Sequence, residues 1–270
     1  MEIRLKENER IDDLERNGYR IIQNRNRFCF GMDAVLLSCF AAEGEKRRPG
    51  KCALKCADLG TGTGIIPILL YGRLCNPEMV NMSQTGENQP MNMGIQIDAL
   101  EIQSEMCEMA SRSVRINRLE SWIHIRQGDI CNASQLLGKG QYDAVVSNPP
   151  YKKQGGGLIN PDDSKAISRH EVLCTFQDVA QQAALLLKSG GRFYLVHRPE
   201  RLAELIITMK GCGFQIKRMR MVHSYQDSKA AMVLLEATRG GGEFLSVENP
   251  LIIYQKQGVY TEEIRKLYYY

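Results

Sequence analysis

The sequence predicts an α/β fold, in which a mostly parallel seven-stranded sheet carries helices on both faces and ends in a C-terminal antiparallel hairpin. Three observations support this prediction. A strand, a glycine-rich loop and an apolar helix follow one another over residues 53–74. Apolar strands and helices then alternate to about residue 210, which is the order that a parallel sheet requires. Two β-rich stretches, 214–222 and 230–236, follow and suit an antiparallel pair.

The region before residue 53 is expected to form a short hairpin and one helix. Aromatic and apolar residues alternate from Tyr19 to Phe30, a pattern typical of paired strands. Asp33 is the expected N-cap of the helix. The polar stretch 43–50 should end it. The apolar face of this helix consists of Ala34, Val35, Leu36, Leu37 and Phe40.

The remaining elements follow from apolar runs and the polar segments between them. The segment 76–94 is rich in Asn, Met, Gln and Pro and is expected to be a surface insertion, and the basic, glycine-rich segment 152–165 is expected to be a flexible loop. A short strand and a helix should close the chain. The expected strands are 53–58, 95–100, 122–126, 142–147, 192–196, 214–222, 230–236 and 251–254, and the expected helices are 65–74, one ending near 117, 171–188, 199–210 and one ending at 268–270.

The composition is that of an ordinary globular protein in a reducing compartment. The 270 residues are 43% apolar and 24% charged, with a net charge of +4, which permits nucleic-acid binding without requiring it. The amino terminus is too charged for a signal peptide, and no apolar run reaches membrane-spanning length. Nine scattered cysteines then favour free thiols. Cys52 and Cys56 lack a second pair at ligand spacing, so we expect no metal. The charged amino terminus and the lack of a spanning run lead us to expect a cytoplasmic protein without membrane contact.

The glycine loop at 60–64 indicates which cofactor the fold would bind. Counted from Gly60 or Gly62, the sixth position is Ile65 or Pro67, so the dinucleotide pattern is not met. No lysine follows Gly64, as a phosphate loop would require. S-adenosylmethionine is the candidate that remains. It has no phosphate, and glycines allow its atoms to approach the backbone closely.

Three carboxylates that end successive strands suit the same ligand. Glu101 could accept hydrogen bonds from both ribose hydroxyls, and Asp129 from the adenine amino group. Asp58 could hold the methionine ammonium, directly or through water. Each residue alone is more simply interpreted as a solvated charge at a strand end. Their order beside a glycine loop favours the cofactor interpretation.

The segment Ser147-Asn148-Pro149-Pro150-Tyr151 follows a buried strand and offers hydrogen-bond acceptors. Its two prolines have no N–H and hold the chain extended, which leaves carbonyl oxygens without local donors. With the Asn148 side-chain oxygen, these carbonyls suit a planar amino group, and Tyr151 offers a face on which a base can stack. A proline-rich turn without function is the structural alternative.

Taken together, these motifs resemble the class I S-adenosylmethionine-dependent methyltransferases of the small-domain group. The chain is most similar to the bacterial tRNA(Val) adenine-37 N6-methyltransferase family. The resemblance implies a Rossmann-like fold with a hairpin and helix that cap the cofactor site (1–50), a methyltransferase domain (51–240) and a packed C-terminal extension (241–270). It is carried by the stretches 28–37, 57–64, 99–103, 148–151, 169–171 and 197–202.

The resemblance also implies S-adenosylmethionine as cofactor, tRNA as partner, a monomer and a set of site residues. The implied catalytic residues are Asn148, Pro149, Pro150 and Tyr151. The implied cofactor-binding residues are Phe30, Asp33, Asp58, Gly60, Thr61, Gly62, Gly64, Glu101, Ile102, Asp129, Ile130 and Asn148. The expected RNA contacts are Lys152, Lys153, Arg169, His170, Arg198, Lys217, Arg218 and Arg220, of which Lys217, Arg218 and Arg220 can equally be interpreted as solvated surface charge.

The expected reaction is N6-methylation of a tRNA adenine that is flipped into the Asn148–Tyr151 pocket. His170 could act as a base, although this chemistry requires none. Three alternatives remain at this point: a protein-glutamine N5-methyltransferase of release factors, whose amide offers the same two protons; an N6-adenine methyltransferase of rRNA or DNA; and an RNA-binding module that has kept the fold.

Overall fold

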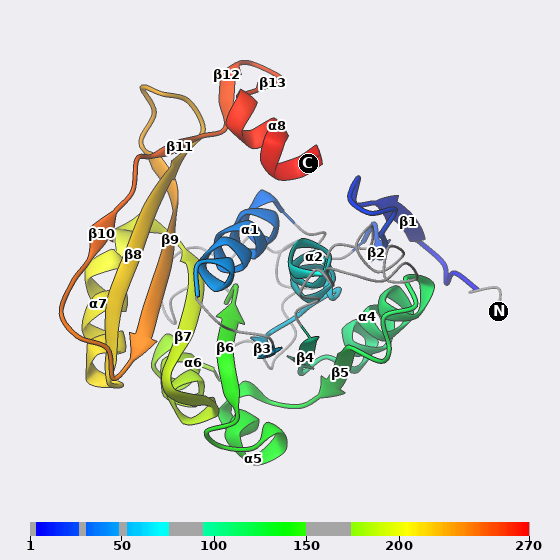
Figure 1. Ribbon diagram of the computed structural model, residues 1–270. Coiled ribbons are helices and arrows are strands. Elements are labelled where there is room, and N and C mark those ends of the chain that lie inside the picture. Colours follow the sequence, from blue (N-terminus) through cyan, green and yellow to red (C-terminus); the bar gives the residue numbers. More distant parts are fainter. Residues whose placement is uncertain (1–3, 27–30, 49–52, 76–93, 150–173, 270) are drawn as a thin grey trace, which may run out of the picture.

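The computed structural model describes residues 4–26, 31–48, 53–75, 94–149 and 174–269. Its centre is a nine-stranded sheet (Figure 1). Seven long strands lie in the order β5 (Ile123–Gln127), β4 (Gly94–Glu101), β3 (Ala53–Leu59), β6 (Tyr142–Ser147), β7 (Leu187–His197), β9 (Ala230–Arg239) and β8 (Phe214–His223). The first five pair in parallel, and β9 runs antiparallel to both β7 and β8. The predicted α/β class, the mostly parallel sheet and the C-terminal hairpin are therefore confirmed.

Two layers of helices cover the sheet, because successive strand residues point to opposite faces. Tyr194 of β7, for example, belongs to one buried cluster and Phe193 to the other. The first cluster includes side chains of α1 (Met32–Lys46), α2 (Ile65–Leu74) and α4 (Ser104–Ile116). The second includes side chains of α5 (Ala133–Leu137), α6 (Phe176–Leu186) and α7 (Leu202–Gly211). Both faces of the sheet are thus buried, as a parallel sheet requires.

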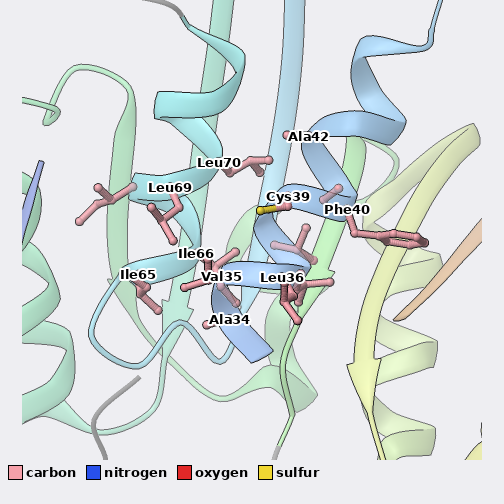
Figure 2. Close-up of a cluster of buried hydrophobic side chains, with 14 of the residues drawn as sticks. Ala34, Val35, Leu36, Cys39, Phe40, Ala42, Ile65, Ile66, Leu69 and Leu70 are labelled. Carbon is pink, nitrogen blue, oxygen red and sulfur yellow. The ribbon is translucent and has the colours of Figure 1, made fainter. Parts of the chain in front are cut away.

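Helices α1 and α2 lie side by side, and their apolar side chains fill the space between them (Figure 2). Leu36, Leu37, Ile66 and Ile68 are each at most 2% exposed. Burial of each such side chain stabilises the fold by about 1.5–3 kcal/mol. This packing holds the start of α1 beside the glycine loop that precedes α2.

Short elements at the two ends of the chain pack onto this core. The hairpin of β1 (Glu9–Asp13) and β2 (Arg20–Asn24) is held to α4 by Ile22 N–H, which donates to Ser113 Oγ at 3.0 Å. Helix α8 (Glu262–Tyr269) is held to α2 by Arg73, whose Nη2 donates to the Leu267 carbonyl at 2.7 Å. The other short strands are β10 (Ser246–Val247) and β11 (Leu251–Ile252), which pair with β8, and β12 (Tyr254–Lys256) with β13 (Val259–Tyr260).

Several boundaries differ from those expected. Helix α6 begins at Phe176, after the N-cap Thr175, and ends at Leu186, whereas 171–188 was predicted. Strand β9 runs three residues further than predicted, to Arg239. Helix α1 begins at Met32 with Gly31 as its N-cap, so Asp33 lies in the first turn. The helix also runs on to Lys46, because Glu45 is buried and accepts a hydrogen bond from Tyr194 Oη at 2.9 Å. Strand β7 begins five residues early, at Leu187, which already pairs with Tyr142 before an irregularity in the ladder. The expected insertion at 76–93 and the expected loop at 152–165 lie outside the described residues.

The expected RNA contact at Arg218 is not supported, because this side chain is buried. Arg218 is 5% exposed and lies over the Phe40 ring, with the guanidinium carbon 3.8 Å from the ring centroid. It forms ion pairs with Glu236 at 3.3 Å and Glu248 at 3.4 Å. Its neighbours in the expected basic cluster are also engaged. Lys217 donates to the Gly242 carbonyl, and Arg220 donates to the Asn249 carbonyl and pairs with Glu263.

We predict that Gly44→Ala destabilises the protein, although alanine is the better helix former. A Cβ on Gly44 would clash with the Tyr194 hydroxyl and would lie 2.9 Å from Tyr194 Cε1 and 3.0 Å from Glu236 Oε2. The expected loss is about 1–3 kcal/mol in the free energy of unfolding, measured by urea denaturation. Gly211→Ala, at the end of α7 with open space around its Cβ, is the matched control and should be neutral or stabilising. Equal effects of the two changes would contradict the packing argument.

Among the described residues, no helix is both long and apolar enough to cross a membrane.

Candidate functional site

The five parallel strands bring the polar segments that follow them to one edge of the sheet. Leu59, the last residue of β3, is in register with Leu100 of β4 and with Ser147 of β6. Ser147 Oγ donates to the Leu59 carbonyl at 2.8 Å, which joins the two central strands at this edge. The glycine loop, the ends of β4 and β5, and Asn148 therefore share one site. This edge is where open α/β sheets bind ligands.

The glycine loop has a backbone shape that other residues rarely adopt. Gly60, Gly62 and Gly64 have φ angles of +83°, +57° and +84°. A Cβ built on Gly62 would meet Met106 Cε at 4.0 Å, and one on Gly60 would meet Ile130 Cδ1 at 3.6 Å, so neither position is tightly packed. At Gly64 a Cβ would instead meet the Ala110 Cβ of α4 at 3.3 Å. The first two glycines are thus required by their φ angles and not by packing, whereas the third also allows α2 to pack closely on α4.

The end of β4 fixes the loop through one carboxylate. Glu101 is 6% exposed; its Oε2 accepts a hydrogen bond from Gly62 N–H at 2.9 Å, and its Oε1 accepts one from Gln103 N–H at 3.0 Å. The amides of Gly60 and Thr61 both donate to the Leu100 carbonyl at 3.0 Å. A carboxylate has about four acceptor positions, so Glu101 can still accept from a bound diol.

The end of β5 contributes a second carboxylate at the same edge. Asp129 caps the 3₁₀ turn η1 (Ile130–Asn132) by accepting a hydrogen bond from Cys131 N–H at 2.8 Å. Ile130 lies against the glycine loop, since its Cδ1 is the atom 3.6 Å from a Cβ built on Gly60. At the end of β4, the Ile102 carbonyl accepts from Gln127 Nε2 at 3.4 Å. Ile130 thus lies beside Gly60, directly after Asp129 in the chain.

The structure corrects the expected role of Asp58. Its side chain is 0% exposed, and neither carboxylate oxygen is accessible or has a hydrogen-bond partner within normal distance. Burial raises the pKa of Asp58 to about 7; the nearby Thr61 hydroxyl opposes this shift and the negative charge of Glu101 adds to it. A ligand ammonium therefore cannot touch Asp58 in this arrangement. Its carboxylate lies near the Thr61 hydroxyl of the glycine loop.

We predict that Asp58 makes folding stability pH-dependent. Its folded pKa lies above its unfolded value, so the folded state binds more protons between about pH 4 and pH 7. The free energy of unfolding should therefore fall as pH rises through this window, by up to about 1.4 kcal/mol per pH unit from this residue. Urea denaturation of the ligand-free protein and of Asp58→Asn at several pH values measures the difference. If the difference in unfolding free energy between the wild type and Asp58→Asn did not change with pH, the raised pKa of Asp58 would be contradicted.

Asn148 is held by a residue far away in the chain. Its Nδ2 donates to Asp33 Oδ2 at 3.0 Å, and Asp33 Oδ1 accepts from Ala34 N–H at 2.9 Å, which fixes the carboxylate on the first turn of α1. Because an ionised carboxylate only accepts hydrogen bonds, the amide nitrogen must face Asp33 and the amide oxygen must face away from it. The sequence predicted both Asp33 and Asn148 as site residues, but it did not predict the hydrogen bond between them.

Other expected site residues are partly outside the described region. Among the described ones, Pro149 is buried directly after Asn148, and Arg198 is exposed at the end of β7. Its backbone N–H donates to Nδ1 of the buried His197 at 2.8 Å. Phe30, Pro150, Tyr151, Lys152, Lys153, Arg169 and His170 lie outside the described residues.

Comparisons with known proteins agree with this geometry. The family described as "Methyltransferase small domain" matches residues 32–210. A tRNA1(Val) (adenine(37)-N6)-methyltransferase of Serratia proteamaculans is 30% identical over 88% of this chain and 80% of its own. A protein of the same name from Porphyromonas gingivalis is 27% identical over 88% and 86%. Among solved structures, a predicted O-methyltransferase from Agrobacterium tumefaciens has a TM-score of 0.58 at 22% identity, covering 87% of this chain and 95% of that one.

Proposed function

Since this chain belongs to the methyltransferase small domain family, and within it to the tRNA1(Val) (adenine(37)-N6)-methyltransferases, we propose that it methylates N6 of adenine 37 in tRNA(Val). The observation that carries the proposal is the Asn148 side chain, which the Asp33 carboxylate orients beside the glycine loop. The relatives' names do not favour methylation of a release-factor glutamine, of rRNA or of DNA.

S-adenosylmethionine is the proposed cofactor, and when bound it supplies an electrophilic methyl group. The chain's residues fit it. Gly60 and Gly62 have no side chain that would keep a ligand away from the loop backbone, and Glu101 retains acceptor positions for the two ribose hydroxyls. Ile130, beside Gly60, and Asp129 would contact the adenine. Asp33, Ile102 and Thr61 would then support the site through the loop and Asn148.

The proposed role of Asn148 is to accept protons from the target amine. The lone pair of the adenine amino group is delocalised into the ring, which makes it a poor nucleophile. Hydrogen bonds from its two N–H groups to Asn148 Oδ1 and the Pro149 carbonyl favour a pyramidal nitrogen and direct the lone pair toward the methyl group. The rate enhancement comes from positioning and electrostatics. No strong base is needed, because the methylated, positively charged nitrogen loses its proton readily.

Arg198 is the proposed phosphate contact among the described residues, since it is exposed at the edge where the reaction would occur. We predict that Arg198→Ala weakens tRNA binding. It should also reduce the slope of log K against log salt concentration by about 0.7–0.9. Lys139→Ala is the matched control, because Lys139 is exposed before β6, at the opposite edge of the sheet. The proposal fails if both variants keep the wild-type slope in filter-binding titrations.

The function is tested by methyl transfer from labelled S-adenosylmethionine to unmodified tRNA(Val). A transcript with guanine at position 37 and a release-factor fragment are assayed beside it. Label on tRNA(Val) alone is the expected result. Label on the protein fragment would move the function to glutamine methylation, and label on the guanine transcript would show that adenine 37 is not the target.

A further inference from the structure

A cluster of metal-ligating side chains lies beside η1, outside the proposed reaction centre. Cys131 Sγ, Cys174 Sγ and one carboxylate oxygen of Asp178 all lie within 4.8 Å of one another. All three residues are half-buried. They come from two segments, the 3₁₀ turn after Asp129 and the start of α6, so no spacing in the sequence marks them as a set.

Each member of the cluster retains an atom that can bind a ligand. Asp178 Oδ2 accepts hydrogen bonds from the Thr175 N–H at 2.8 Å and the Thr175 Oγ1 at 2.6 Å, as part of the capping box of α6. This places the carboxylate rigidly and leaves Oδ1 outside the cap. Both cysteines are free thiols that interact with each other, and the Cys174 thiol also makes a long contact of 3.8 Å with the Thr175 carbonyl.

The electrostatics of the cluster favour a cation. The Asp129 carboxylate lies beside the cluster, because its Oδ1 accepts from the Cys131 N–H at 2.8 Å. Two thiols and the Asp178 carboxylate are thus gathered in one place next to a second carboxylate. A divalent cation would offset the negative charge of this group and stabilise the thiolates directly.

We propose that Cys131, Cys174 and Asp178 bind a thiophilic divalent cation, with zinc the ion whose chemistry suits the set best. Two sulfurs and one carboxylate oxygen supply three ligands of a tetrahedral zinc site and leave a fourth position for water. Binding one cation to the two thiols and the carboxylate forms two metal–sulfur bonds and releases two protons. The bound ion joins the turn that carries Asp129 to the first described helix after Asn148.

Titration of the full-length, reduced protein with Co²⁺ tests the site, because cobalt–thiolate bonds absorb light and zinc displaces cobalt. The expected result is a thiolate absorption that saturates at one cation per chain, is lost on addition of Zn²⁺, and comes with release of about two protons per cation. Cys131→Ser and Cys174→Ser should each weaken binding by at least about ten-fold, and Asp178→Asn, which keeps the cap, should weaken it less. Cys212→Ser changes a half-buried thiol outside the cluster and should bind as the wild type does.

Proton release on Co²⁺ binding is measured on the wild-type protein, so the proposal can still be tested if a variant fails to fold. The absence of thiolate absorption in the wild type, or its survival in a Cys131→Ser/Cys174→Ser double variant, would overturn the proposal. Formation of a Cys131–Cys174 disulfide with a diazene oxidant, in a protein that binds no Co²⁺ when reduced, would also overturn it.

Discussion

Asn148→Ala should lower kcat for methyl transfer to tRNA(Val) by about 10²- to 10³-fold, while the dissociation constant of S-adenosylmethionine stays nearly unchanged. The Asn148 amide oxygen is the proposed acceptor of an amine proton, and its effect grows as positive charge develops on the nitrogen. An interaction that strengthens in the transition state appears in kcat rather than in ground-state binding. Single-turnover kinetics and calorimetric titration of the cofactor measure the two quantities separately.

Ser147→Ala is the matched control for this change. Ser147 precedes Asn148, and its hydroxyl is buried and donates to the Leu59 carbonyl at 2.8 Å. Its loss should cost about 1 kcal/mol of stability and change kcat little. A large loss of cofactor binding in Asn148→Ala, or an unchanged kcat, would contradict the proposed role of the amide.

The site could be predicted from the sequence where its signals are local. Gly60, Gly62 and Gly64 follow an apolar strand, and only glycine adopts their positive φ angles easily. Glu101 was located by the end of an apolar run, because parallel strands place their carboxyl ends at one edge. A glycine run and the end of an apolar run each involve residues that are adjacent in the chain, so both can be recognised in the sequence itself.

The error at Arg218 has a structural cause that local signals do not reveal. The ladder between β8 and β9 is irregular between Ile216 and Arg218: Ile216 lies opposite Ala237 and Arg218 opposite Glu236. One extra residue on β8 reverses which side chains face α1. Arg218 therefore lies over Phe40 of α1 and is buried with Glu236, although its basic neighbours suggested a solvated surface. Nothing in the residue pattern marks a bulge at that position.

The contact between Asp33 and Asn148 was likewise beyond the sequence, because 115 residues separate the two. Asp33 was expected to bind the cofactor, whereas its carboxylate accepts from the Asn148 amide and from Ala34 N–H. A Cβ on Gly31 would come within 2.7 Å of Asp33 Oδ1, so the small residue before the helix leaves room for this carboxylate. The arrangement suggests a positioning role, which leads to a different prediction from cofactor binding.

Asp33→Ala should lower kcat by about 10- to 100-fold, because the Asn148 amide can then rotate and present its N–H groups to the amine in place of its oxygen. The cofactor dissociation constant should change little. Asp33→Asn should retain part of the activity, since its own amide oxygen can still accept from Asn148 Nδ2. Both constants are measured in the same assays as for Asn148→Ala.

A double-mutant cycle separates this positioning role from a direct one. If Asp33 acts only through Asn148, then Asp33→Ala should cause little further loss of kcat in the Asn148→Ala background, because no amide remains to be oriented. A full additional loss in that background would show that Asp33 acts on the reaction independently of Asn148. A rise in the cofactor dissociation constant in Asp33→Ala alone would instead restore the role in cofactor binding that the sequence suggested. The coupling between two residues 115 positions apart is thus the quantity that decides what the first turn of α1 contributes to the site.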